Sequence, residues 1–91
     1  MQDDEKQRDA KEPIEVSADA HQNLEALVRA IGGPGALAKT GIATKAAFYY
    51  WRSGSHMISA ETAVDLLRWF KANINPHCPM DLYDLRPDLR V

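Results

Sequence analysis

The sequence has one cysteine, Cys78, and no apolar run long enough to cross a bilayer. One thiol cannot form an internal disulfide, which excludes a disulfide-stapled fold and favours a reducing compartment. A membrane-spanning helix needs about 20 consecutive apolar residues. Residues 1–6 are polar and acidic, unlike a secretory signal. We therefore expect a cytoplasmic protein that has no membrane partner.

The residue groupings of enzymes and metalloproteins are also missing. His21, His56 and His77 are far apart in the sequence, and Cys78 beside His77 still leaves a zinc ion short of its four ligands. The glycines of residues 32–35 lack both the Gly-Lys-Ser/Thr ending and the preceding strand of a phosphate-binding loop. No nucleophile, base and acid stand out as a set. These absences favour a protein without catalytic activity, metal or cofactor.

Basic residues are few and unevenly distributed. The chain carries 11 basic and 13 acidic residues, a formal net charge of −2. Residues 1–20 contain seven acidic and three basic residues, a net of −4, whereas residues 21–77 contain six basic and three acidic residues, a net of +3. This distribution permits nucleic-acid binding by the middle of the chain without requiring it.

The first 16 residues differ in composition from the rest of the chain. They have few apolar and many charged side chains, and Pro13 adds a break. Such a segment cannot bury enough surface to offset the entropy lost on ordering. We expect a disordered, flexible acidic tail over residues 1–16 and a single domain over residues 17–91. The tail is either a solubilising extension or a DNA mimic that shields the basic part of the domain.

The apolar spacing predicts helices only, since no strand signal exceeds three residues. A first helix begins near Ser17 or Asp19, either of which can cap a helix start. Its apolar face consists of Leu24, Leu27, Val28 and Ile31. The glycines at positions 32 and 33 end this helix. Pro34 then suits the first turn of a second helix, which extends to about residue 39 or 40.

Two longer helices and a short one follow. Thr44 can cap a third helix over about residues 45–52, which the Ser-Gly-Ser of residues 53–55 ends. A fourth helix starts after Ser59 and extends to about residue 72. Its buried stripe is expected to contain Ala63, Leu66, Leu67, Phe70 and Ile74. After a loop over residues 73–79, residues 80–85 predict one helical turn that Pro87 ends. The predicted fold class is all-α, with four to five short helices.

The second and third predicted helices have the pattern of a helix-turn-helix unit. Gly41 hinges them, and the small residue Ala38 lets the two backbones approach closely. Thr44 stands at the start of the third helix, and Phe48 and Trp51 lie three residues apart on one of its faces. The second helix of such a unit usually lies in the major groove of DNA.

These residues resemble a known family. Residues 27–51, followed by the Leu-Arg-Pro-Asp of residues 85–88, are similar to the Cro-type regulators of bacteriophages and prophages, and in particular to the YdaS-like subgroup of candidate antitoxins. The resemblance covers about residues 24–90 and implies a lambda-repressor-like helix-turn-helix domain. One departure is that Gly41 follows Ala38 by three residues, where the family has four. We expect Ala43 to take the buried apolar position of the turn.

The resemblance also implies a role for individual side chains. Leu37, Ala38, Phe48 and Trp51 would face inward and hold the two helices together. Base contacts would come from the start of the third helix, and phosphate contacts from its end and from the second helix. The residues expected to bind DNA are Gly35, Lys39, Thr44, Lys45, Ala46, Tyr49, Tyr50, Arg52, Ser53 and Ser55.

The function implied is a sequence-specific, Cro-like transcriptional repressor of phage or prophage origin. It would bind a double-stranded operator as a homodimer, in the bacterial cytoplasm and in association with the nucleoid. The fourth helix or the C-terminal segment, with Trp69, Tyr83 and Leu89, would form the dimer surface. The alternative is an antitoxin-like or host-factor-inhibiting module in which Tyr49 and Tyr50 contact a protein partner instead of DNA.

Overall fold

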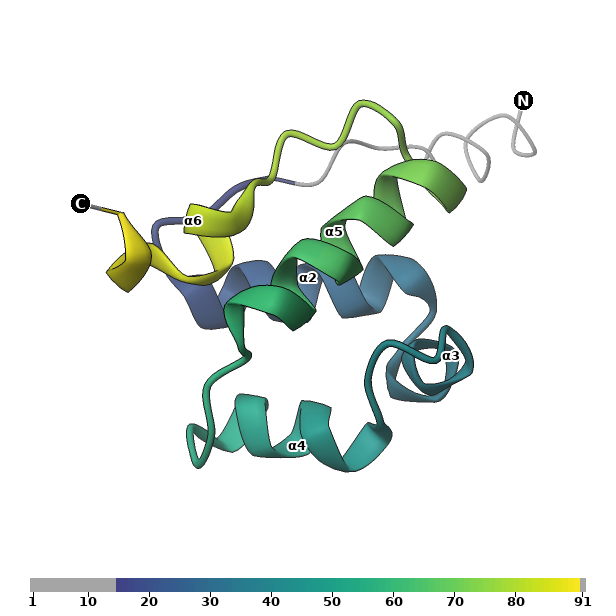
Figure 1. Ribbon diagram of the computed structural model, residues 1–91, viewed down its shortest axis with the longest axis horizontal. Helices are drawn as coiled ribbons and strands as arrows, with labels where there is room; N and C mark the ends of the chain where they lie inside the picture. Colours follow the sequence, from purple (N-terminus) through teal and green to yellow (C-terminus); the bar gives the residue numbers. More distant parts are fainter. Residues whose placement is uncertain (1–14, 91) are drawn as a thin grey trace, which may run out of the picture.

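The computed structural model describes residues 15–90, and within this range every regular element is helical. Five α-helices are present: α2 (Ala20–Ile31), α3 (Pro34–Lys39), α4 (Lys45–Ser53), α5 (Ala60–Asn73) and α6 (Leu82–Leu85) (Figure 1). A short 3-10 turn, η1 (Pro87–Leu89), closes the described chain. The predicted all-α class is confirmed. The expected tail of residues 1–16 falls outside the described residues except for Glu15 and Val16, which are both exposed.

Local side-chain chemistry sets where these helices begin. The Asp19 carboxylate accepts the His21 amide at 2.9 Å, and Thr44 Oγ1 accepts the Ala47 amide at 3.0 Å. Ser59 caps α5, and Asp81 caps α6 in a reciprocal pair with Asp84. Because each cap satisfies amide groups that the first helical turn leaves unpaired, the helix starts are fixed by single residues.

Two glycines set where α2 and α4 end. Gly32 has φ of +126° and Gly54 has φ of +83°, in the positive region that side chains disfavour. Pro34 occupies the first turn of α3, as the sequence predicts. Helix α4 extends one residue beyond the predicted end, to Ser53, and α5 extends to Asn73.

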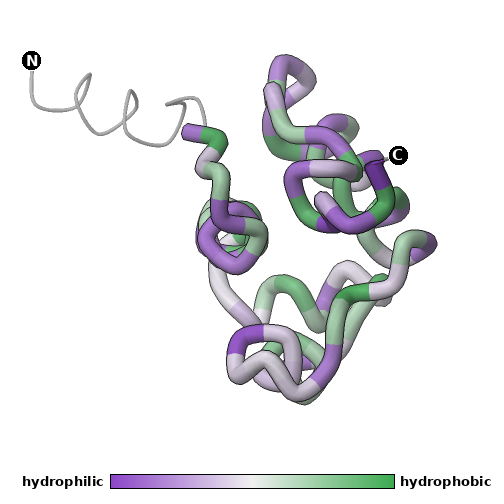
Figure 2. The backbone as a smooth tube through the Cα atoms, turned by 90° about the vertical axis from the view of Figure 1, so that its left-hand side faces the viewer, coloured by the Kyte–Doolittle hydropathy of each residue, from purple (hydrophilic) through white to green (hydrophobic). Residues whose placement is uncertain are grey.

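The core lies between the helices, and each helix contributes its apolar face. In the side view of Figure 2, hydrophobic and hydrophilic residues alternate along the helical turns. Helix α2 packs against α3, α4 and α6, and α5 packs against α6. The core residues are Leu24, Leu27, Val28, Leu37, Phe48, Trp51, Ile58, Ala63, Leu66, Leu67, Phe70, Cys78, Met80 and Leu85.

The burial pattern corrects one part of the predicted stripe of α5. Four of its five members are buried, but Ile74 is 42% exposed because it caps the C-terminal end of the helix, beyond the packed face. Cys78 and Met80 fill the core from the loop that follows. Ala38 is half-buried, whereas Leu37 beside it is fully buried.

Asn23 is the one buried polar residue among residues 15–90. Its amide nitrogen donates to the Ser17 carbonyl at 2.8 Å and to the Asp84 carbonyl at 2.9 Å, while its oxygen accepts the Ser17 amide at 2.7 Å. A buried amide is tolerated when its hydrogen bonds are made. Asn23 therefore joins the segment before α2 to the C-terminal helix α6.

Candidate nucleic-acid interface

Helices α3 and α4 are joined by a five-residue turn over residues 40–44. Thr40 Oγ1 donates to the Leu37 carbonyl at 2.7 Å and accepts the Ile42 amide at 3.1 Å. Gly41 has φ of +77°, and this conformation turns the chain between α3 and α4. Ile42 and Ala43 are partly buried and pack against the core. Ala43 is expected from the sequence to take the buried apolar position of the turn, but it is only partly buried and shares this place with Ile42.

Helix α4 has one buried and one exposed face. Phe48 and Trp51 are 5% and 7% exposed, so they attach the helix to the core. Tyr49 and Tyr50 are each 50% exposed. Lys45 is exposed at the N-terminal end of the helix, where Thr44 is the cap. The outward face of α4 therefore combines a cation with two aromatic rings that carry hydroxyl groups.

The structure leaves all ten predicted contact residues exposed. Seven of them lie on α4 or its cap, namely Thr44, Lys45, Ala46, Tyr49, Tyr50, Arg52 and Ser53. Ser55 follows immediately, and its Oγ lies 2.9 Å from that of Ser53. Gly35 and Lys39 come from α3, which packs against α4. The two helices lie together at the lower end of the molecule in Figure 1, away from α6.

Charge in this part of the chain has a single sign. Residues 26–60 contain four basic residues and no acidic one. These are Arg29, Lys39, Lys45 and Arg52, and all four are exposed. Surface cations attract a polyanion.

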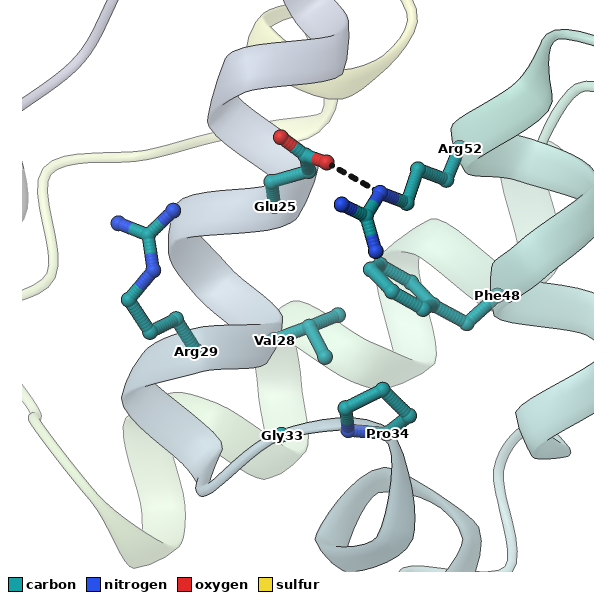
Figure 3. Close-up of a pocket in the computed structure, with 7 residues that line it drawn as sticks. All are labelled: Glu25, Val28, Arg29, Gly33, Pro34, Phe48 and Arg52. Carbon is teal, nitrogen blue, oxygen red and sulfur yellow. Dashed lines mark ion pairs between the residues drawn. The ribbon is translucent and has the colours of Figure 1, made fainter.

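A pocket of about 250 Å³ lies where α2, the start of α3 and α4 meet (Figure 3). Its lining includes Glu25 and Arg29 from α2, Pro34 from α3, and Phe48 and Arg52 from α4. The Glu25 Oε1 atom lies 3.1 Å from Nε of Arg52, an ion pair that joins α2 to α4. This pair fixes Arg52 through Nε and leaves the two terminal nitrogens of its guanidinium outside that contact.

Sequence reasoning missed Glu25 and Arg29 as neighbours of the candidate interface. Arg29 lies in the last turn of α2, just before the Gly-Gly-Pro break that leads into α3. That position places Arg29 near the start of α3, so its nearness to the candidate interface could have been inferred from the sequence. The ion pair between Glu25 and Arg52 had no such signal, because it depends on how α2 crosses α4.

The Leu-Arg-Pro-Asp segment packs beside the loop that follows α4. Leu85 is buried, and the Arg86 guanidinium donates to the Ile58 carbonyl at 2.7 Å. The same guanidinium forms two hydrogen bonds to the Asp88 carboxylate, at 2.8 and 2.7 Å. This bonding lowers the pKa of Asp88 and raises the pKa of Arg86 relative to their ordinary values. The segment thereby ties the C-terminus to the loop between α4 and α5.

Comparison of the chain with models of protein families, with curated proteins and with solved structures gave no match. Among the residues that the structure describes, no helix is long and apolar enough to traverse a membrane. No group of three or more potential metal-ligating acidic, histidine or cysteine side chains occurs within residues 15–90. The arguments for function therefore come from the α3–α4 surface itself.

Proposed function

We propose that the protein is a sequence-specific DNA-binding regulator that inserts α4 into the major groove. The observation that carries this proposal is the outward face of α4, which presents Lys45, Ala46 and Tyr49 on a helix anchored from beneath by Phe48 and Trp51. An α-helix with a polar outer face fits the width of the major groove. The resemblance to Cro-type phage and prophage regulators supports the same reading.

Each side chain has a role that follows from its chemistry. Lys45, at the end of α4 that usually meets base edges, donates to guanine acceptors or to a phosphate. The small Ala46 side chain allows close approach or contacts a thymine methyl group. Tyr49 donates a hydrogen bond through its hydroxyl. Arg52 and Lys39 contact phosphates, which orient the domain without discriminating between sequences.

The protein acts by binding alone, as a repressor that occludes a promoter in the bacterial cytoplasm. The four cations of residues 26–60 release few counterions, so a single domain binds weakly. A homodimer on a symmetric operator restores affinity, because two α4 helices then engage successive major grooves about 34 Å apart.

The double variant Lys45→Ala/Tyr49→Ala tests this assignment. The operator is first selected from a pool of random duplexes. We expect the affinity of the variant for this operator to fall by at least about 100-fold, since two direct contacts are removed. Both side chains are exposed, so circular dichroism should show unchanged helix content. Arg68→Ala, on the exposed side of α5, is the matched control and should bind like the wild type. Wild-type affinity in the double variant would refute the assignment.

A protein-binding module of the antitoxin-like or host-factor-inhibiting kind is the second candidate. It is favoured by the half-exposed rings of Tyr49 and Tyr50, because exposed aromatic side chains are frequent anchors of protein interfaces. A mobility shift with random duplex at low salt separates the two candidates. Absence of any shift at micromolar protein, together with copurification of a stoichiometric partner, would favour the second.

A further inference from the structure

An apolar groove lies on the side of the domain closed by the Leu-Arg-Pro-Asp segment. It has a volume of about 150 Å³. Three parts of the chain line it: the start of α2 with Leu24, the end of α4 and following loop with Trp51 and Met57, and the C-terminal segment with Leu85 and Pro87. An apolar cavity of about this volume holds a molecule as large as benzene. One apolar side chain therefore fits into it.

An exposed side chain beside the groove, Met57, could fill the same groove on a second molecule. Met57 stands at its edge and is 66% exposed, more than any other large hydrophobic side chain of residues 15–90. A two-fold interface uses the same patch on both subunits, so that patch must supply both the projection and the cavity. The flexible methionine side chain adapts well to an irregular cavity.

The groove is also lined by His21, His56 and Asp88, and of these the Asp88 carboxylate can be covered at little cost. The Asp88 carboxylate is already held by two hydrogen bonds from Arg86. Burial of a charge is expensive chiefly when its partner is missing. A second molecule can therefore cover the groove without leaving this carboxylate unpaired.

The position of the groove also suits a protein that places two α4 helices on DNA. It borders the C-terminal end of α4, and Lys45 lies at the other end. Nine residues of helix span about 14 Å. If the two α4 axes lay in line, with their C-terminal ends about 10 Å apart, their Lys45 residues would be about 35–40 Å apart. One turn of DNA is roughly 34 Å.

We infer that the groove is the homodimer interface, in which Met57 of each protomer inserts into the groove of a second copy of this chain. This inference rests on the proposed function for the spacing argument, whereas the groove and its projection stand independently. Of the surface expected from the sequence, this interface keeps the C-terminal segment, through Leu85 and Pro87, and leaves out Trp69, Tyr83 and Leu89.

Sedimentation velocity of the wild type and of Met57→Glu, without DNA, tests the inference. The wild type should reach a dimer at micromolar concentrations. The variant buries an unpaired carboxylate in each of two symmetric grooves, so its dimer dissociation constant should rise by at least about 100-fold. Ile74→Glu, a matched change at the opposite end of α5, should dimerise like the wild type. Helix content by circular dichroism checks folding, and the isosteric Met57→Gln replaces the first variant if it misfolds.

The outcomes separate this inference from the proposed function. A wild type that remains monomeric would overturn the inference and leave the groove to a different protein. A Met57→Glu protein that still dimerises, or an Ile74→Glu protein that dissociates, would overturn it as well. Loss of the dimer in Met57→Glu supports it whether or not either protein binds duplex, because the measurement contains no DNA.

Discussion

At the scale of single residues, Asn23 shows how one buried amide connects distant parts of the chain. Its three hydrogen bonds reach the backbone on both sides, at Ser17 and at Asp84. Nothing in the sequence marks this role, since Asn23 is flanked on α2 by the exposed Gln22 and the buried Leu24. The partner at Asp84 is 61 residues away, which no local pattern encodes.

Replacing Asn23 with leucine should therefore destabilise the domain. The substitution leaves three part-buried backbone groups without this partner, at a cost of about 2–4 kcal/mol in the free energy of unfolding. Urea denaturation followed by circular dichroism measures it. Gln22→Leu, at the neighbouring exposed position, should change stability by less than about 0.5 kcal/mol. Equal effects of the two changes would contradict the buried role of Asn23.

The ion pair between Arg86 and Asp88 predicts a dependence of stability on pH. Hydrogen bonds from Arg86 lower the pKa of Asp88 in the folded state, so its ionised form stabilises the fold. That contribution is complete above the ordinary pKa of an aspartate and is lost as the pH falls through the lowered value, below about pH 4.

The variant Asp88→Asn isolates this contribution. At neutral pH it should be less stable than the wild type by a small amount, because the carboxylate is 45% exposed. The difference between the two proteins should shrink as the solution is acidified below about pH 4. Urea midpoints measured over a pH series check this. A difference that grows with acidity would refute the stabilising role of the ionised carboxylate.

At the scale of elements, the ends of helices are where the sequence is most informative. Asp19, Thr44, Ser59 and Asp81 each cap a helix, and their chemistry acts within three residues, so it can be identified locally. The exposed face of α4 follows equally from the burial of Phe48 and Trp51. Burial of Cys78 and Met80 could not be foreseen, because a loop enters a core only when other elements leave it space.

Glycines at two helix positions should respond in opposite ways to alanine. At Gly32, φ is +126° and an added Cβ would lie 3.1 Å from Cβ of Ala36, so Gly32→Ala should cost about 1–3 kcal/mol. Gly35 lies inside α3 with open space around it, so Gly35→Ala should gain about 0.5–1 kcal/mol. Thermal unfolding of the two variants measures whether each change lowers or raises the stability of the domain. Stabilisation by Gly32→Ala would show that the α2–α3 junction differs from this geometry.

At the scale of the whole molecule, the charge balance would limit how the proposed regulator binds DNA. A net charge of −2 would repel a polyanion if it were evenly spread, yet residues 26–60 are free of acids. Attraction is thus confined to one end of the domain, and Glu25 already engages Arg52 there. If the protein is the proposed regulator, its affinity for DNA is expected to depend on groove contacts and dimerisation more than on phosphate neutralisation.

The dependence of DNA affinity on salt concentration measures how much phosphate neutralisation contributes to binding. With the four cations of residues 26–60 at the proposed interface, the slope of log K against log salt should be no steeper than about −4 per protomer, because each neutralised phosphate contributes about −0.9. Lys39→Ala should make the slope shallower by about one, whereas Lys71→Ala on α5 should leave it unchanged. Fluorescence anisotropy with labelled duplex over a salt series gives the slopes. A slope that Lys39→Ala leaves unchanged would exclude that lysine from the interface.

The hydrogen bonds of the Asn23 amide also bear on how the connectivity of the chain could be changed. It draws Ser17 and Asp84 to within bonding distance of one side chain, so the segment before α2 and helix α6 are neighbours. A glycine-serine linker from residue 90 to residue 15, long enough to leave these hydrogen bonds in place, could join the two segments, and new termini could then be opened in the loop before α5. Circular permutants of this kind should keep the helices, because the Asn23 hydrogen bonds do not depend on which segment comes first in the chain.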